Sequence, residues 1–275
     1  MNVTHRDPVD PADLLAIALD AARAAARLVV DERPPGRLGV ANTKSSQTDI
    51  VTVMDQRAEA LLLERITAAR PEDGFLGEEG AAREGRTGVT WVVDPIDGTV
   101  NYLYGIPAFA VSVAARTTGG VLVGVVANPV SGETWTAVRG GGAHLDGRPI
   151  RVNAAPELAM ALVATGFGYA AERRAKQADV LRQVLPRVRD VRRAGAASLD
   201  LCALACGRVD AYYEQGLQPW DLAAGGLITE EAGATVGGLA GRPAGEALVV
   251  AGPEPLFGEL VTLLADLGAD ELPAG

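Results

Sequence analysis

Three short segments offer acidic residues of the kind that could bind a divalent cation. The segments are F-L-G-E-E-G, W-V-V-D-P-I-D-G-T and P-W-D-L-A-A-G-G, and the acidic residues are Glu78, Glu79, Asp94, Asp97 and Asp221. Two carboxylates directly after an apolar strand are costly to bury unless a cation neutralises them. Magnesium prefers such oxygen ligands and often keeps coordination positions for water and a substrate phosphate. We therefore expect an acidic pocket if the fold brings the three segments together.

Each segment also has a simpler interpretation. Glu78 and Glu79 could form a solvated turn, and Asp221 could cap the N-terminus of a helix. D-P-I-D-G-T is harder to explain in this way, because Asp94 follows three apolar residues directly and Gly98 lets the backbone approach a ligand. The usual phosphate loops are missing: the chain has no G-x-x-x-x-G-K-[ST], and T-G-F-G-Y-A lacks the third glycine of a dinucleotide-binding turn. A phosphate group would have to be bound by other means.

The composition and charge of the chain narrow its class. Of its 275 residues, 48% are hydrophobic and 22% are charged, as in soluble globular proteins. The net charge of −10 disfavours nucleic acid and anionic membranes as partners, so a phosphate-bearing substrate needs a locally supplied positive charge. No apolar run reaches the roughly 18 residues that span a bilayer, and residues 1–13 are polar, unlike a signal peptide. The expected compartment is the cytoplasm.

The few cysteines and histidines argue against soft-metal and histidine chemistry. Cys202 and Cys206 lie four residues apart on one face of a predicted short helix, and core packing is their favoured role because no further soft ligand accompanies them. His5 lies near the start of the chain, and His144 lies in a glycine-rich segment that predicts a turn. The two histidines therefore give little support to a Ser-His-Asp hydrolase or to a His-ligated zinc site.

Hydrophobic periodicity predicts two helices followed by a meander of strands. Asp10 caps a helix that runs from Pro11 to about Asp31, where E-R-P-P-G-R-L-G ends it. A second helix starts near 52–55 and ends before Pro71, and the polar residues 43–49 are expected to be exposed. Apolar alternation then predicts a largely antiparallel meander, separated by glycine turns, with strands at 89–93, 109–116, 121–127, 133–138 and 150–152.

The second half of the chain mixes helices and strands. Strands are predicted at 162–165, 211–214 and 247–251, and helices at about 171–188, 198–206, 221–232 and 254–267. The chain has no flexible linker and no repeat. The sequence therefore predicts a single domain, 1–275, in which a half of about 10–152 carries the acidic loops and a half of about 153–270 meets it near 151–156.

The combined motifs resemble the inositol monophosphatase family, the lithium-sensitive, magnesium-dependent sugar phosphatases. D-P-I-D-G-T-V-N matches the first signature of that family, P-W-D-L-A-A-G-G-L-I-T-E-E-A-G-A the second, and G-E-E its metal loop. The similarity extends over residues 44–55, over D-V-R-R-A-G-A-A-S-L-D-L-C and over D-A-Y-Y-E, and so covers nearly the whole chain beyond the first helix. It implies an α/β (α+β) fold, layered as an αβαβα sandwich, and a homodimer.

The resemblance implies two or three magnesium ions and the residues that hold them. Glu78, Asp94 and the backbone carbonyl of Ile96 would hold one ion. Asp94, Asp97 and Asp221 would hold a second, and Glu78 would also face a weaker third site. Such a cation lowers the pKa of bound water toward neutrality, and a metal pair about 4 Å apart can clamp the attacking and leaving oxygens in line. The metals would also supply the positive charge that an acidic surface lacks.

Roles in catalysis and substrate binding follow from the same resemblance. Thr99, paired with Asp55, would orient and help to deprotonate a metal-bound water, with Glu78 as a further catalytic residue. Relatives commonly carry Thr or Ser at the position of Ala196, so this chain lacks a hydroxyl there. The residues implied to contact the phosphate and the sugar or cyclitol are Glu78, Ile96, Asp97, Gly98, Thr99, Gly195, Ala196, Ala197, Glu214 and Asp221.

The leading hypothesis is a magnesium-dependent phosphomonoesterase that hydrolyses inositol monophosphate to myo-inositol and phosphate by direct attack of a metal-activated water. Histidinol phosphate, fructose 1,6-bisphosphate and 3'-phosphoadenosine 5'-phosphate stay open as substrates, because a fold and a metal cage do not set the leaving group. Glu214 in Y-Y-E favours a polyol, whose hydroxyls a carboxylate can accept.

Two other classes of protein are considered. An aspartyl-phosphate phosphatase uses D-x-D-G-[TV], and here two residues separate Asp94 from Asp97 instead of one, which disfavours that geometry. A non-catalytic phosphosugar-binding protein would not need a water-activating pair, yet Asp55 and Thr99 are both present.

Overall fold

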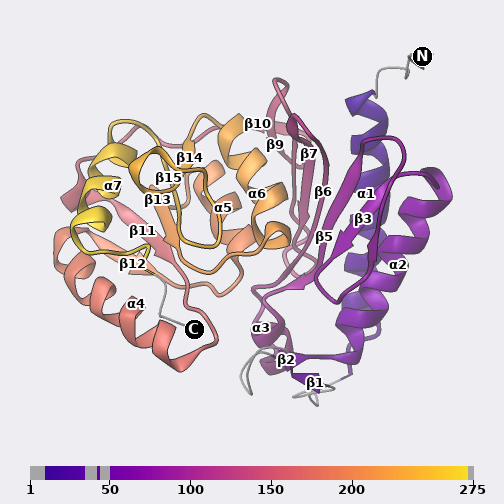
Figure 1. Cartoon of the computed structure of the whole chain (residues 1–275), viewed down its shortest axis with the longest axis horizontal. Helices are drawn as coiled ribbons and strands as arrows, with labels where there is room; N and C mark the ends of the chain where they lie inside the picture. The colour runs from indigo at the N-terminus through magenta and orange to yellow at the C-terminus, as the bar shows by residue number, and fades with distance from the viewer. Residues whose placement is uncertain (1–9, 35–41, 44–49, 272–275) are drawn as a thin grey trace.

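The protein consists of five alternating layers of helices and sheets (Figure 1). This computed structural model describes residues 10–34, 42–43 and 50–271. Helices α1 and α2 form one outer layer, an eight-stranded sheet the next, α5 and α6 the middle layer, a five-stranded sheet the fourth, and α4 and α7 the other outer layer. The αβαβα sandwich that the resemblance implied is confirmed.

The eight-stranded sheet is mostly antiparallel and places the ends of two strands side by side. Strands β3 and β5 pair in parallel, with Gly77 opposite Val93, so Glu78 and Asp94 follow at the same edge of the sheet. Its strands run in the order β10 (Arg148–Ile150), β9 (Gly142–Leu145), β8 (Thr134–Val138), β7 (Gly120–Ala127), β6 (Ala110–Thr117), β5 (Thr90–Asp97), β3 (Gly74–Gly77) and β4 (Ala82–Arg83).

Helices α1 (Pro11–Asp31) and α2 (Val53–Ala69) cover the outer face of this sheet. The Asp10 carboxylate accepts a hydrogen bond from the Ala12 N–H at 2.8 Å, which caps α1. Alternate residues of β6, such as Val111 and Val113, face these helices, while Ala110 and Ala114 face α5 and α6. Two short strands, β1 (Asn42–Thr43) and β2 (Ile50–Val51), pair antiparallel near the start of α2.

The five-stranded sheet is mixed and lies on the other side of the middle layer. Helices α5 (Ala197–Ala205) and α6 (Pro219–Glu231) touch both sheets, whereas α4 (Ala171–Val184) and α7 (Leu256–Asp266) cover the far face. Its strands run in the order β12 (Asp190–Arg192), β11 (Leu162–Thr165), β13 (Ala211–Glu214), β15 (Val249–Gly252) and β14 (Thr235–Gly237), and the 3-10 turns are η1 (Leu158–Met160), η2 (Leu185–Arg187) and η3 (Leu239–Gly241).

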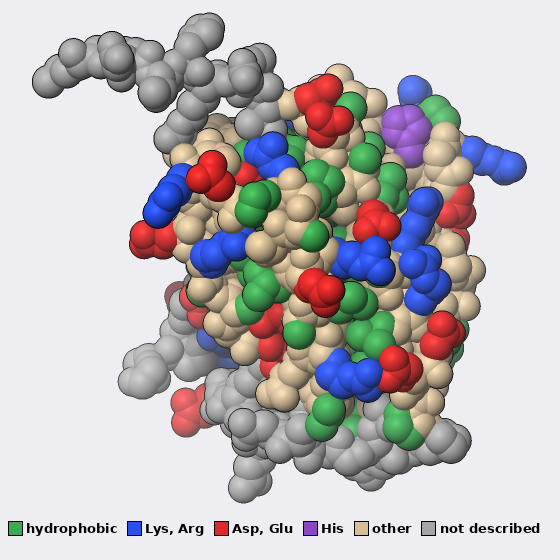
Figure 2. Space-filling view, turned by 90° about the vertical axis from the view of Figure 1, so that its right-hand side faces the viewer, with side chains coloured by type: hydrophobic (Ala, Val, Ile, Leu, Met, Phe, Trp, Pro, Cys, Tyr) green, Lys and Arg blue, Asp and Glu red, His purple; other side chains and the backbone are tan. Residues whose placement is uncertain are grey.

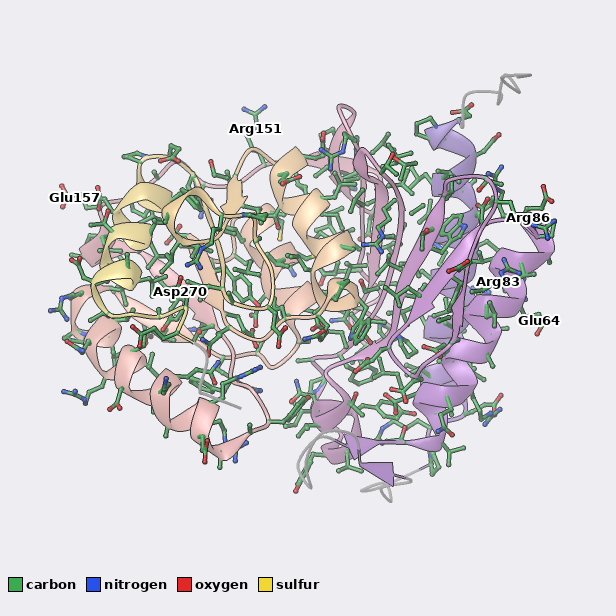
Figure 3. The ribbon with its side chains drawn as sticks, in the orientation of Figure 1. Glu64, Arg83, Arg86, Arg151, Glu157 and Asp270 are labelled. Carbon is green, nitrogen blue, oxygen red and sulfur yellow. The ribbon has the colours of Figure 1, made fainter. Side chains whose placement is uncertain are left out.

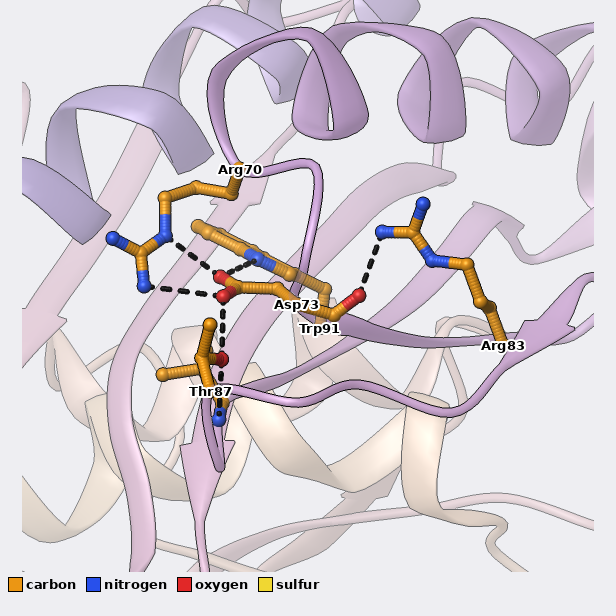
Figure 4. A network of polar contacts seen from close by, with 6 residues as sticks. Arg70, Asp73, Arg83, Thr87 and Trp91 are labelled. Carbon is orange, nitrogen blue, oxygen red and sulfur yellow. Dashed lines mark hydrogen bonds and ion pairs between the residues drawn. The ribbon is translucent and has the colours of Figure 1, made fainter. Parts of the chain in front are cut away.

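A buried carboxylate fixes the beginning of β3 to its neighbours (Figure 4). The side chain of Asp73 is fully buried and accepts hydrogen bonds from Arg70 Nε at 2.9 Å, from Thr87 Oγ1 at 2.6 Å and from Trp91 Nε1 at 2.9 Å. Arg70 also donates from its second nitrogen at 3.1 Å, so the pair is bidentate, and Arg83 donates to the Asp73 carbonyl. This network holds the end of α2, β3 and β5 in fixed register.

Opposite charges alternate on the outer helical face. Figure 2 looks at the right-hand side of Figure 1 and shows Lys and Arg side chains interspersed with Asp and Glu. Two of these pairs join α2 to α1 or to the residue that follows it: Arg65 with Asp20 at 3.3 Å, and Arg57 with Glu32 at 2.5 Å. Exposed pairs of this kind contribute about 1 kcal/mol or less, so the apolar core beneath them sets the packing.

Most predicted elements are present, but several boundaries were wrong. The helix predicted to reach 188 ends at Val184, where η2 begins, and the strand predicted at 150–152 is β10, which ends at Ile150. His144 lies in β9 and not in a turn, because residues 142–150 form a hairpin. Both cysteines are free thiols; Cys202 is buried in the core, which confirms the packing role for that residue, whereas Cys206 is only partly buried. Of the stretch expected to be exposed, 44–49 lies outside the described residues.

Candidate metal centre and active site

A break in the pairing of β5 presents Asp94 and Asp97 at the end of the strand. The register with β6 shifts between these two residues, and Gly98 then takes a left-handed conformation with φ 92° before helix α3 (Thr99–Tyr104) begins. A Cβ at position 98 would lie 2.9 Å from the Ala108 carbonyl oxygen, so only glycine fits without a shift. The acid pair thus lies in an irregular strand end that runs into a short helix.

Three carboxylates converge at this point. Oxygens of Asp94, Asp97 and Asp221 all lie within 4.8 Å of one another, with Asp221 contributed by the first turn of α6, where it accepts a hydrogen bond from the Gln218 N–H at 2.7 Å. These three residues line a cavity of about 460 Å³, and Glu78 lines it as well. Residues from the three acidic segments of the sequence therefore lie around one cavity.

The electrostatics of this cluster fit a divalent cation. Burial raises the pKa of Asp94 well above its ordinary value, and repulsion from Glu78 and the other carboxylates raises it further. Burial also raises the pKa of Asp221 well above its ordinary value, and repulsion from Glu78 and Asp97 raises it further. Crowded carboxylates of this kind either hold protons or bind a cation, and an all-oxygen donor set suits magnesium.

A threonine and an aspartate form a second feature of the site. The hydroxyl of Thr99 lies 3.1 Å from Asp55 Oδ1 and 3.0 Å from the Ile96 carbonyl oxygen. Asp55 is fully buried on α2 and accepts two hydrogen bonds from Thr52, from the N–H at 2.8 Å and from the hydroxyl. Burial raises the pKa of Asp55 to about 6, with the bonds from Thr52 opposing the rise. The Thr99 hydroxyl is thereby held at the cavity wall.

Helix α5 points its N-terminus at Asp97. The Asp97 carboxylate accepts hydrogen bonds from the Ala197 N–H at 3.2 Å and the Ser198 N–H at 2.7 Å, as well as from the Ser198 hydroxyl. Ala196 is buried directly before this helix, and its Cβ would be 3.2 Å from a Cβ at Gly98. The absent hydroxyl at Ala196 therefore leaves a methyl group packed against the loop of the acid pair.

The loop before α5 is tied to α3. Asn101 donates from Nδ2 to the carbonyls of Ala108 at 2.7 Å and Ala194 at 2.9 Å. Gly195 has φ 93°, and a Cβ there would approach Asn101 Nδ2 to 2.9 Å. Gly195, Ala196 and Ala197, which the resemblance places on the substrate side, line the same cavity.

Glu214 and Arg193 also line this cavity, and Asp200 and Tyr212 interact with Glu214. Burial raises the pKa of Glu214 to about 7, although Tyr212 donates a hydrogen bond to it at 2.7 Å. Burial and repulsion from Glu214 raise the pKa of Asp200 to about 8, while the positive charge of Arg193 acts in the opposite direction. Arg193 also lies 5.9 Å from the centre of the Phe167 ring and lines the cavity.

All ten residues implied to contact substrate line this one cavity, and Asp55 lies behind it in contact with Thr99. Sequence reasoning missed Ser198, Asp200, Arg193 and Tyr212. Asp200 carried a usable signal, since it is an acid inside the apolar run L-D-L-C-A-L-A. Arg193 and Tyr212 carried none, because their closeness to the acids depends on how β13 and α5 pack.

A layered α/β fold that surrounds a carboxylate-lined cavity suits an enzyme that binds a metal ion and a small ligand. The model of the inositol monophosphatase family matches residues 10–266. The chain is 50% identical over 226 residues to the inositol-1-monophosphatase SuhB of Mycobacterium tuberculosis, covering 79% of this chain and 78% of that one. It is 40% identical over 264 residues to the Nus factor SuhB of Pseudomonas aeruginosa, covering 91% and 95%.

A solved structure of one of these relatives has the same fold as this chain. Mycobacterium tuberculosis SuhB superimposes with a TM-score of 0.81 at 44% identity, over 96% of this chain and 100% of that one. The chain belongs to the inositol monophosphatase family, and this membership supports a phosphatase activity on a phosphate monoester. Among the described residues, no helix has both the length and the apolar character needed to cross a membrane.

Proposed function

We propose that this protein is a magnesium-dependent phosphomonoesterase that hydrolyses inositol monophosphate to myo-inositol and phosphate. The observation that carries the proposal is the convergence of Asp94, Asp97 and Asp221 within 4.8 Å, in a cavity that Glu78 and Thr99 also line. Magnesium bound there would neutralise the phosphate charge and lower the pKa of a bound water. The side chains proposed to hold it are Glu78, Asp94, Asp97 and Asp221, with the carbonyl of Ile96.

The Thr99 hydroxyl is proposed to orient the attacking water. Its contacts with Asp55 and with the Ile96 carbonyl fix its position at the cavity wall. Asp55 accepts from Thr99 and can take up a proton, because burial raises its pKa to about 6. The neighbouring N–H groups of Gly98 and Thr99 are proposed to donate to phosphate oxygens. Direct attack by water requires no covalent enzyme intermediate.

Glu214 and the residues beside it are proposed to bind the polyol. Glu214 and Asp97 can accept hydrogen bonds from adjacent ring hydroxyls, and Tyr212 orients Glu214. Gly195 and Ala197 line the same cavity, and Ala196 contributes no hydroxyl. We further propose a cytoplasmic, lithium-sensitive homodimer in which residues 10–152 and 153–270 form the two halves of one domain.

A panel of phosphate esters tests the substrate. We expect inositol 1-phosphate, assayed with magnesium, to exceed histidinol phosphate, fructose 1,6-bisphosphate and 3'-phosphoadenosine 5'-phosphate by about tenfold or more in kcat/KM. Histidinol phosphate outpacing inositol 1-phosphate by an order of magnitude would overturn the substrate assignment but not the chemistry. A trapped aspartyl phosphate at Asp94 would overturn direct attack by water.

A further inference from the structure

A buried glutamate on α2 lies directly behind the turn that carries Glu78. Glu59 is 4% exposed, and its two carboxylate oxygens accept hydrogen bonds from different backbone groups of this turn. Oε2 accepts from the Glu79 N–H at 2.8 Å, and Oε1 accepts from the Ala81 N–H at 2.9 Å. The side chain therefore bridges from the helix to both sides of the tip of the turn.

The turn is shaped to receive this carboxylate. A Cβ at Gly77 would lie 2.0 Å from Glu59 Oε2, so the space that a side chain would fill at position 77 is occupied by the glutamate. The Gly77 N–H donates to the Ala81 carbonyl at 2.8 Å, which closes the turn, and the Glu78 N–H donates to the Val93 carbonyl of β5 at 3.3 Å. Glu59 thus holds the turn by the N–H groups of Glu79 and Ala81, while the N–H of Glu78 holds it to β5, the strand that carries Asp94.

The same face of α2 reaches both parts of the site. Asp55 and Glu59 are four residues apart and both buried, so they point to one side of the helix. Asp55 holds the Thr99 hydroxyl at 3.1 Å, while Glu59 holds the turn of Glu78. One rigid helix therefore sets the position of the threonine hydroxyl relative to the glutamate of the metal cluster.

We propose that Glu59 is a positioning residue that places Glu78 for metal binding. The inference rests on the proposed function only in that the cation is taken to be magnesium. A carboxylate is needed at position 59 because two N–H donors converge on it, and each of its oxygens accepts from one of them. An amide offers one acceptor oxygen and turns an NH2 group toward the second N–H.

The test compares E59Q with E64Q, which makes the same change in charge on an exposed part of α2. Figure 3 shows the exposed Glu64 on the outer side of that helix. Magnesium affinity is measured by titration calorimetry without substrate, and the melting temperature in EDTA checks the fold. We expect E59Q to bind magnesium about tenfold more weakly or worse, as partners of metal ligands typically do when replaced, and E64Q to match the wild type.

Two further readouts separate positioning from a merely structural role. We expect the magnesium concentration for half-maximal rate to rise in E59Q while kcat at saturating magnesium stays within about threefold, since Glu59 touches no reacting atom. E59D keeps the charge but is one methylene shorter, so it should resemble E59Q. An E59D variant that binds magnesium like the wild type would mean that charge and not placement matters, and would overturn the inference.

Amide hydrogen exchange tests the contacts without metal or activity. The Glu79 and Ala81 amides should be protected in the wild type and exchange at least about tenfold faster in E59Q. Rapid exchange of both amides in the wild type would overturn the inference even if E59Q failed to fold. Wild-type magnesium affinity in folded E59Q overturns the role of Glu59 alone, whereas a wild-type protein that binds no magnesium overturns the proposed function as well.

Discussion

Replacement of Asp200 by asparagine should stabilise the metal-free protein, increasingly so as the pH rises. Asp200 is 3% exposed on α5, and burial, with repulsion from Glu214 and Asp97, raises its pKa from 3.8 to about 8. The native state therefore binds this proton more tightly than the unfolded chain does. The resulting stability is fully present below pH 3.8 and is lost as the pH rises through about 8. Asparagine has no such proton to lose.

The size of the effect follows from the shift. Each pKa unit corresponds to about 1.4 kcal/mol, so the wild type should lose about 1.4 kcal/mol per pH unit relative to D200N between about pH 4 and pH 8. The gain in the free energy of unfolding should be of order 3 kcal/mol at about pH 6 and of order 5 kcal/mol above about pH 8. Asparagine has nearly the same shape, so little of this difference should be cancelled by lost packing.

Urea unfolding in EDTA, followed by tryptophan fluorescence from pH 5 to pH 9, measures this difference. D179N serves as the matched control, because Asp179 is exposed on α4 and its curve should run parallel to that of the wild type. Parallel curves for D200N and the wild type would refute the reasoning, since they would mean that Asp200 gains no proton on folding.

Two further predictions concern the site and the sheet behind it. T99A should leave magnesium affinity within about twofold of the wild type and lower kcat by about 10²-fold or more, as for other positioned proton-transfer groups. Calorimetry measures the affinity and steady-state rates measure kcat, with T262A on the exposed face of α7 as the control. Unchanged turnover in T99A would contradict the role of Thr99. D73A should lower the free energy of unfolding by about 3–5 kcal/mol, because Arg70, Thr87 and Trp91 lose a buried charged acceptor. Urea unfolding measures this loss, with the exposed variant E72A as the control. A loss in D73A equal to that in E72A would contradict the buried network.

The local signals in the sequence predicted the long helices and the antiparallel meander. Helix α1 begins after the Asp10 cap and ends at Asp31 as expected, because capping and periodicity act within a few residues. Strand β3 was missed, since F-L-G is short and its pairing with β5 comes from a distant segment. Helix α3 was missed because Gly98 turns the chain in a left-handed conformation that T-V-N-Y-L-Y does not reveal.

The acids of the site were predictable, whereas their supports were not. Asp94, Asp97 and Asp221 follow apolar or helix-start signals that a single sequence displays. Glu59 looks like an ordinary acid in a helix, and only the packing of α2 against the turn buries it. The same holds for Asp73, in P-E-D-G, whose carboxylate accepts four hydrogen bonds from the side chains of Arg70, Thr87 and Trp91. Burial of a charged group is a property of the assembled layers.

The central claim is that the acid cluster binds magnesium and thereby drives phosphate release. The most direct measurement is phosphate release from inositol 1-phosphate while magnesium is titrated into EDTA-treated protein, for the wild type and for D94N. A metal centre contributes several kcal/mol to transition-state stabilisation, so activity should be absent in EDTA, saturate with magnesium, and fall about a hundredfold or more in folded D94N. Full activity in EDTA, or a D94N rate equal to that of the wild type, would contradict the account.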